Sequence, residues 1–126
     1  MTIQERLNIP LNERRKIEKK VLPEFYKEIR VHRKTFEIRK DEDDIQVGDI
    51  LVLREWDGEK YTGSMTRREV TYVLRDAEEY GLMKGYCIIG MHSVGWNWFR
   101  PSVVMEQTGD NNVQIANCGT MNIDMR

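Results

Sequence analysis

The amino-acid sequence predicts an α+β fold: a small β-barrel or strongly curved sheet of about five strands, with one or two short helices. Two patterns predict it. Short segments in which apolar and polar residues alternate follow one another closely, with glycine turns between them, as in small barrels. A segment with helical spacing precedes them, and there are no βαβ units or internal repeats. The length of 126 residues, with 40% hydrophobic and 33% charged residues, fits one globular domain.

The first 17 residues are expected to form a polar leader outside the domain. Pro10 argues against a long helix there, because proline lacks an amide proton and clashes with the preceding turn. Residues 13–20 are so dense in charge that we expect them to be solvated. The domain itself is expected to span residues 18–92.

One helix is expected to begin at Pro23, because proline suits the first helical position and Glu24 places an acidic side chain in the first turn. Phe25 and Ile29, four residues apart, would form its buried face, and it would end near Arg33. After this point the pattern changes from the helical period to the strand period.

Residues 34–40 are expected to form the first strand, because apolar and polar side chains alternate along them. Phe36 and Ile38 would face the core. The residues expected on the opposite face are Thr35, Glu37 and Arg39. Residues 41–44 (DEDD) would then form a solvated loop, since they lack the spacing of a calcium-binding loop.

The other strands follow at short intervals. Residues 50–53 are apolar on both faces, which is typical of a central strand. The pair Asp57-Gly58 predicts a hairpin turn, and Trp56 beside it is expected to pack rather than to serve as a stacking platform. The remaining strands are expected in the segments 61–62, 70–74 and 86–91.

Residues 93–126 are expected to be an extension of different character. It begins with an aromatic cluster of Trp96, Trp98 and Phe99. Such a cluster either stacks on nucleic-acid bases or, as we favour here, seals the core or an interface. Residues 107–126 carry few charges and have high β propensity, which predicts a strand, a turn and a second strand.

The charge distribution is uneven although the net charge is only −1. Residues 13–40 contain eleven Lys or Arg and five Glu, a local net charge of +6, and residues 41–44 follow with −4. A basic helix and strand beside a neutral barrel are typical of a phosphate-binding surface. An ordinary solvated face in a charge-rich protein would look the same.

Composition also excludes several classes of protein. Cys87 and Cys118 form no CxxC pair, and the first 20 residues lack an apolar signal core, so we expect reduced thiols and a cytoplasmic location. No apolar run approaches the ~20 residues that span a bilayer. His32 and His92 have no metal-ligand spacing to each other or to the cysteines, so neither a metal nor another cofactor is expected.

The segment RKTFEIR at residues 33–39, with GDIL at residues 48–51, resembles the ASCH-domain family, whose members have a PUA-like β-barrel. The segments LPEF, YTG and GY, at residues 22–25, 61–63 and 85–86, look like one small branch from bacteria and their phages. That branch is largely described as a domain of unknown function. The resemblance covers roughly residues 18–91.

The resemblance implies a basic cleft beside the barrel that is suited to RNA or a nucleotide-like small molecule, and we expect this cleft to bind its ligand without chemistry. Lys34, Glu37 and Arg39 match the charged motif that lines the cleft in the family. The ligand-binding candidates of the whole segment are Lys34, Thr35, Glu37, Arg39 and Lys40. The alternative is a surface ion pair between Glu37 and Arg39, which would contribute less than about 1 kcal/mol.

The resemblance also implies an enzyme alternative, because some family members look like amidohydrolases that remove an acyl group from a modified cytidine. These use a lysine, a threonine and a glutamate, and Lys34 matches the lysine. Glu37 stands where the nucleophilic threonine would fall, and a carboxylate does not replace a hydroxyl nucleophile. Glu78 or Glu79 would be the third member. We therefore assign no confident catalytic residue.

The C-terminal tail predicts a third kind of function. Residues 109–119 are similar to the RIP homotypic interaction motif, whose identical strands stack on one another, although Ala116 stands where that family has glycine. A homo-oligomer through residues 109–125 is one possibility, as a fibre or as a closed assembly. A tail that folds back on its own barrel is the other. The assembly candidates are Val113, Gln114, Ile115, Met121 and Ile123.

Overall fold

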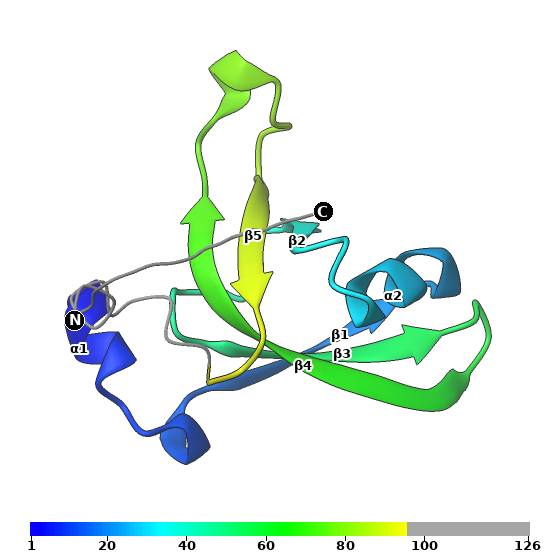
Figure 1. Cartoon of the computed structure of the whole chain (residues 1–126). Helices are drawn as coiled ribbons and strands as arrows, with labels where there is room; N and C mark the ends of the chain where they lie inside the picture. Colours follow the sequence, from blue (N-terminus) through cyan, green and yellow to red (C-terminus); the bar gives the residue numbers. More distant parts are fainter. Residues whose placement is uncertain (96–126) are drawn as a thin grey trace, which may run out of the picture. The chain divides into compact units, whose positions relative to one another are not determined.

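The computed structural model describes residues 1–95, which form one five-stranded sheet that curls into a half-barrel, with two short α-helices (Figure 1). This confirms the prediction of an α+β fold with about five strands. The elements are α1 (Ile3–Leu7), β1 (Lys16–Val21), α2 (Pro23–Arg30), β2 (Phe36–Lys40), β3 (Ile50–Trp56), β4 (Tyr61–Leu74) and β5 (Tyr86–His92), with 3₁₀ turns at Leu11–Glu13 and Glu78–Tyr80.

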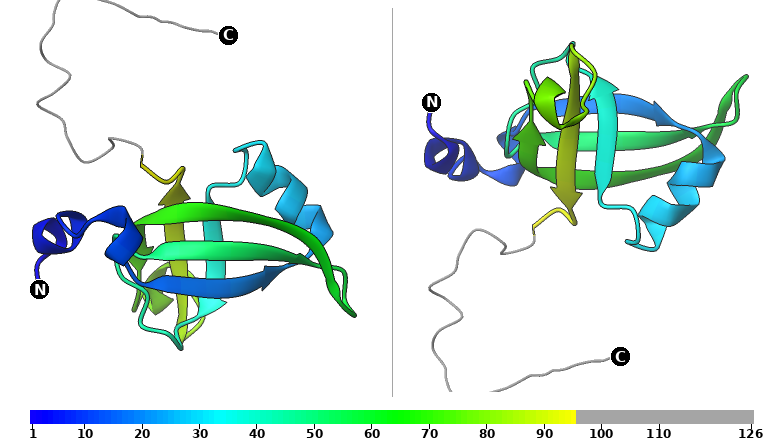
Figure 2. Two further views of the ribbon diagram at one scale, coloured as in Figure 1. Left: turned by 90° about the horizontal axis from the view of Figure 1, so that it is seen from below. Right: turned by 90° about the horizontal axis from the view of Figure 1, so that it is seen from above.

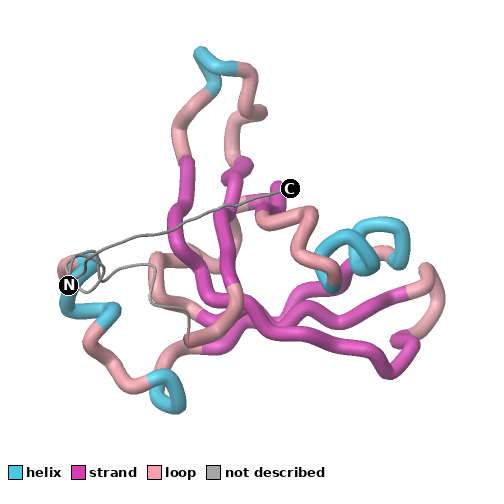
Figure 3. Tube along the Cα trace, in the orientation of Figure 1, coloured by secondary structure: helices cyan, strands magenta, loops and turns pink. Residues whose placement is uncertain are grey.

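The strands are ordered β1-β3-β4-β5-β2, so that β1 and β2 lie at the two edges of the sheet. β1 runs parallel to β3, and the other pairs are antiparallel. β4 is one continuous strand where the sequence predicted two, and its length lets it pair with β3 and then with β5 (Figures 2 and 3). A register shift between Val70 and Tyr72 accompanies the bend of β4.

Strand β3 is the centre of the core, as its apolar sequence predicted. Its first four residues are all buried, and it lies between β1 and β4. The core cluster draws on every strand except β2 and on helix α2. Its buried residues are Val21, Tyr26, Ile29, Ile45, Leu51, Leu53, Val70, Cys87, Ile89 and Met91. No helix within residues 1–95 is both long and apolar enough to cross a bilayer.

Most of residues 13–20 are exposed, as expected, but residues 16–20 also belong to the edge strand β1, which was not predicted. Ile17, Lys19 and Val21 alternate with more exposed residues and turn toward the sheet interior. Lys19 conceals this alternation in the sequence, since its ammonium belongs to an ion pair with Asp43 at 2.6 Å. A long aliphatic stem can cover apolar surface while its charge stays near water.

The leader is more ordered than its sequence suggested. Helix α1 has a capping box in which Thr2 and Glu5 each bond to the other's backbone amide, and it ends before Pro10. Arg14 is buried rather than solvated, and it forms an ion pair with the buried Glu69 of β4. The guanidinium also donates to the carbonyl of Leu7 at 2.9 Å. This buried pair attaches the leader to the sheet.

Helix α2 begins at Pro23 as predicted but ends at Arg30, three residues early. Its buried face consists of Tyr26 and Ile29, whereas Phe25, expected in the core, is 44% exposed. Positions three apart also lie on one helical face, so Tyr26 is buried beside Ile29 in place of Phe25. Arg68 of β4 donates to the carbonyl of Ile29 at 2.8 Å, which fixes the end of the helix.

The faces of strand β2 are the reverse of the prediction. Glu37 is 4% exposed, whereas Phe36 is 43% and Ile38 is 55% exposed. Glu37 pairs with the fully buried Ile89 of β5, so its side chain shares the interior face of the half-barrel. A buried carboxylate is tolerated only where cations compensate its lost hydration, and Lys34 and Arg39 supply them here.

Candidate functional site

An open pocket of about 390 Å³ lies where the two edges of the half-barrel approach each other. We call it the Lys34 pocket. The end of β1, the start of α2 and the strand β2 with the residues before it form its walls. Its lining residues are Lys20, Val21, Leu22, Phe25, Lys34, Phe36, Glu37, Ile38 and Arg39.

Glu37 lies in this pocket between two cations. The Lys34 Nζ donates to Glu37 Oε2 at 2.5 Å, and the Arg39 Nη2 lies 2.7 Å from Glu37 Oε1. The Glu37 side chain is 5% exposed, while those of Lys34 and Arg39 are 17% and 25% exposed. This is more than the surface ion pair that was the alternative, because all three charged groups are largely removed from water and each holds the others in place.

Arg39 also connects the two edge strands. Its Nη2 donates to the main-chain carbonyl of Lys20 at the end of β1, at 2.7 Å. Strands β1 and β2 do not pair with each other, so this side chain bridges the gap that separates them. The planar guanidinium presents several donors in fixed directions, which suits it to hold one carboxylate and one carbonyl at once.

Two aromatic rings flank the lysine. The Lys34 Nζ lies 4.8 Å from the ring centroid of Phe36 and 5.6 Å from that of Phe25. Both distances lie within the range of cation–π attraction. Since both rings are more than 40% exposed, they leave apolar faces open to a ligand beside a positive charge.

The structure brings Lys34, Glu37 and Arg39 together, and it places the other two sequence candidates outside the pocket lining. Thr35 and Lys40 are exposed. Sequence reasoning missed the contribution of β1, which lines the pocket with Lys20 and Val21. The alternation of Ile17, Lys19 and Val21 was the signal that would have revealed this strand.

The pocket is suited to bind an anionic, flat ligand. Three lysine and arginine side chains and one carboxylate line it, a net of +2. Phosphate oxygens accept from such donors, and base rings stack on phenylalanine faces. No hydroxyl side chain belongs to its lining among the described residues. Glu78 and Glu79, the carboxylates considered for an enzyme, are exposed in the β4–β5 connection and do not line the pocket.

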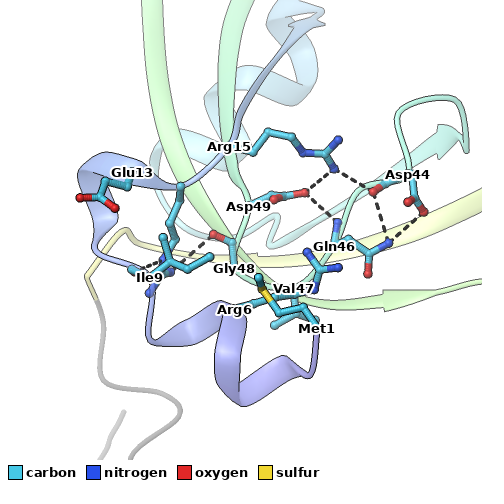
Figure 4. Close-up of a pocket in the computed structure, with 11 residues that line it drawn as sticks. Met1, Arg6, Ile9, Glu13, Arg15, Asp44, Gln46, Val47, Gly48 and Asp49 are labelled. Carbon is cyan, nitrogen blue, oxygen red and sulfur yellow. Dashed lines mark hydrogen bonds and ion pairs between the residues drawn. The ribbon is translucent and has the colours of Figure 1, made fainter.

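A second pocket, of about 430 Å³, lies between the leader and the loop before β3 (Figure 4). Several of its polar groups bind one another. Arg15 Nη2 donates to Asp49 Oδ2 at 2.6 Å and to the Asp44 carbonyl at 2.7 Å, and the main-chain N–H of Gln46 donates to the same Asp49 oxygen. The hydrogen bond from Arg15 to Asp49 raises the pKa of the Arg15 guanidinium. These contacts give the second pocket a structural role, so we take the Lys34 pocket as the candidate site.

Other candidates of the sequence lie elsewhere. Within the part of the chain that the structure describes, no three His, Cys, Asp or Glu side chains are placed to hold a metal ion. The aromatic cluster at residues 96–99 and the assembly candidates Val113, Gln114, Ile115, Met121 and Ile123 lie outside the described residues. Their roles stay predictions from sequence.

Comparison with known proteins relates this geometry to a family without an assigned activity. No curated protein matches the chain. A family model described as "Domain of unknown function (DUF3850)" matches residues 17–91. This range includes all residues that line the Lys34 pocket and all five strands, apart from the first residue of β1 and the last residue of β5. The chain therefore belongs to the DUF3850 family.

Proposed function

We propose that this protein binds RNA or a nucleotide-like ligand in the Lys34 pocket, without chemistry. One observation carries the proposal: Lys34, Arg39 and two exposed phenylalanine rings converge on one pocket at the open seam of the half-barrel. A nucleotide is both anionic and flat, and these side chains complement both properties.

Glu37 supports a binding role rather than a nucleophilic one. Both of its oxygens accept hydrogen bonds from cations, and the described lining holds no hydroxyl that would replace the missing threonine. Glu37 would instead hold Lys34 and Arg39 in fixed positions before the ligand arrives. Preorganised donors lose less conformational entropy on binding than mobile ones.

The resemblance to the ASCH-domain family agrees with this proposal. We infer that the half-barrel is PUA-like and that its seam corresponds to the basic cleft of that family. An RNA or nucleotide ligand also suits the cytoplasmic location that the sequence predicts. Barrels of this kind host several functions, so the proposal depends on the pocket and not on the fold.

The test is a titration with single-stranded RNA and with nucleoside monophosphates at low and high salt. We expect binding that weakens as salt increases, because bound counterions are released from the phosphates. A Lys34→Ala, Arg39→Ala double variant should lose this binding. A Lys84→Ala, Arg67→Ala double variant removes two exposed cations outside the pocket lining and should bind nearly as the wild type does.

The double variant leaves Glu37 buried without its cations, and it could unfold for that reason alone. A Lys34→Gln, Glu37→Gln, Arg39→Gln triple variant removes all three charges and keeps amide groups of similar size. Circular dichroism on each variant verifies the fold. Equal binding by the folded triple variant and the wild type would overturn the proposal, as would the absence of any binding by the wild type.

The enzyme alternative is tested with the same proteins. An acylated cytidine is incubated with the wild type, and the deacylated product is measured. Turnover that Lys34→Ala abolishes would replace the non-catalytic proposal by amidohydrolysis. The expected result is binding without turnover.

A further inference from the structure

A second aromatic group lies directly beside the Lys34 pocket, at the tip of the β3–β4 hairpin. The rings of Trp56, the last residue of β3, and Tyr61, the first residue of β4, contact each other edge to face with centroids 5.1 Å apart. The hairpin tip reaches the end of β1 near helix α2 (Figure 1), and the strand register places Lys20 of β1 opposite Arg54 of β3.

Lys20 belongs to both places. It lines the Lys34 pocket, its carbonyl accepts from Arg39, and its ammonium lies 3.9 Å from the ring centroid of Trp56. Arg54 stacks in the same way on Tyr61, at 3.7 Å. The Lys34 pocket, Lys20 and the hairpin-tip surface of Trp56, Tyr61 and Arg54 therefore follow one another without a break.

The carboxylates around the hairpin tip are largely engaged. Glu18 forms an ion pair with Arg54 at 3.6 Å, and Glu55 accepts from the hydroxyl of Thr62 at 2.7 Å. Asp57 accepts from two backbone amides within its own turn. Lys20 forms no ion pair with any residue in the range 1–95, so its ammonium is available to a phosphate.

We propose that the site extends from the Lys34 pocket across Lys20 to Trp56 and Tyr61, and that its ligand is a single-stranded RNA of two or more nucleotides. This inference rests on the proposed function. One base occupies the Lys34 pocket, Lys20 contacts the phosphate that follows, and the next base stacks on the hairpin-tip surface. This gives Trp56 the role of a stacking platform, which the sequence alone did not favour. Aromatic rings and arginine planes accept unpaired bases of any sequence, whereas the bases of a duplex are stacked on one another.

The test compares a nucleoside monophosphate with a single-stranded RNA tetranucleotide. The wild type should bind the tetranucleotide at least about fivefold more tightly, since stacking one further base on an aromatic side chain is a substantial contribution. Trp56→Leu should remove most of this gain and leave the affinity for the monophosphate within about twofold. Trp56→Phe, which keeps an aromatic face, should retain more of the gain than Trp56→Leu.

Tyr80→Leu is the matched control, because Tyr80 is an 83% exposed tyrosine in the β4–β5 connection. It should change neither affinity. The inference is overturned if the tetranucleotide binds no more tightly than the monophosphate, or if Trp56→Leu weakens both ligands equally. In either case, monophosphate binding that Lys34 supports would leave the proposed function standing. If the wild type binds neither ligand, the proposed function fails and this inference fails with it.

Discussion

Replacing Glu37 by glutamine tests whether the carboxylate organises the pocket. The substitution keeps the size of the side chain and one carbonyl oxygen but removes the negative charge. Two cations, each within 2.7 Å of a Glu37 oxygen and only 17% and 25% exposed, then remain close together without a counter-charge. Hydrogen bonds to charged groups contribute about 1.5–3 kcal/mol each, and removing one member of a buried ion pair costs about 3–5 kcal/mol.

Since Lys34 and Arg39 keep some contact with water, we expect Glu37→Gln to cost less than the full breaking of a buried ion pair. The expected loss of unfolding free energy is about 1.5–3 kcal/mol. For a domain of this size, each kcal/mol lowers the melting temperature by about 4–8 °C. Urea denaturation followed by circular dichroism measures the free energy directly, because its linear extrapolation separates stability from the slope.

Glu18→Gln is the control for this experiment. Glu18 is also a strand glutamate in an ion pair, but its side chain is 61% exposed and its oxygen lies 3.6 Å from Arg54. Exposed pairs of this kind contribute at most about 1 kcal/mol, so the control should change stability little. If Glu37→Gln costs no more than Glu18→Gln, Glu37 does not organise the pocket and our account of β2 is wrong.

The remaining predictions concern the leader, the buried thiol and the tail. Arg14→Met leaves the buried Glu69 carboxylate without its counter-charge. It should lower the free energy of unfolding in urea by about 3–5 kcal/mol, and a loss below about 1 kcal/mol would contradict the anchoring role. Burial raises the pKa of the Cys87 thiol, so in a Cys118→Ser background Ellman's reagent at pH 8 should modify this thiol only in urea. The free energy of unfolding should also fall as the pH rises through the raised pKa. Rapid reaction of the native protein with the reagent would contradict the burial. If residues 109–125 drive assembly, truncation after Glu106 should lower the number of protomers per particle in light scattering, and an unchanged number would exclude that alternative.

Several features could be predicted from local sequence because they depend on neighbouring residues. Pro23 marked the start of α2, and the Asp57-Gly58 pair marked the β3–β4 turn. The apolar run at residues 50–53 identified the central strand, because only a strand covered on both faces tolerates that composition. The charged motif at residues 34–39 drew attention to the side chains that meet in the Lys34 pocket.

Other features depended on partners far away in the sequence. Alternation alone assigned Glu37 to the outer face of β2, because a carboxylate is ordinarily solvated. Its burial depends on Lys34 and Arg39 and on the position of β2 at the seam. Strand β1 was missed because its inward Lys19 is compensated by Asp43, 24 residues later. Arg14 was missed likewise, since its counter-charge Glu69 is 55 residues away.

The sequence by itself therefore determined the fold class, several of the turn positions and the residues that carry charge near the site. Only the tertiary structure decided which of these charges are buried and which elements meet at the pocket. The physical reason is that hydrophobic periodicity and turn propensity are local properties. The free energy of burying a charge, in contrast, depends on whether the fold brings a compensating charge to it.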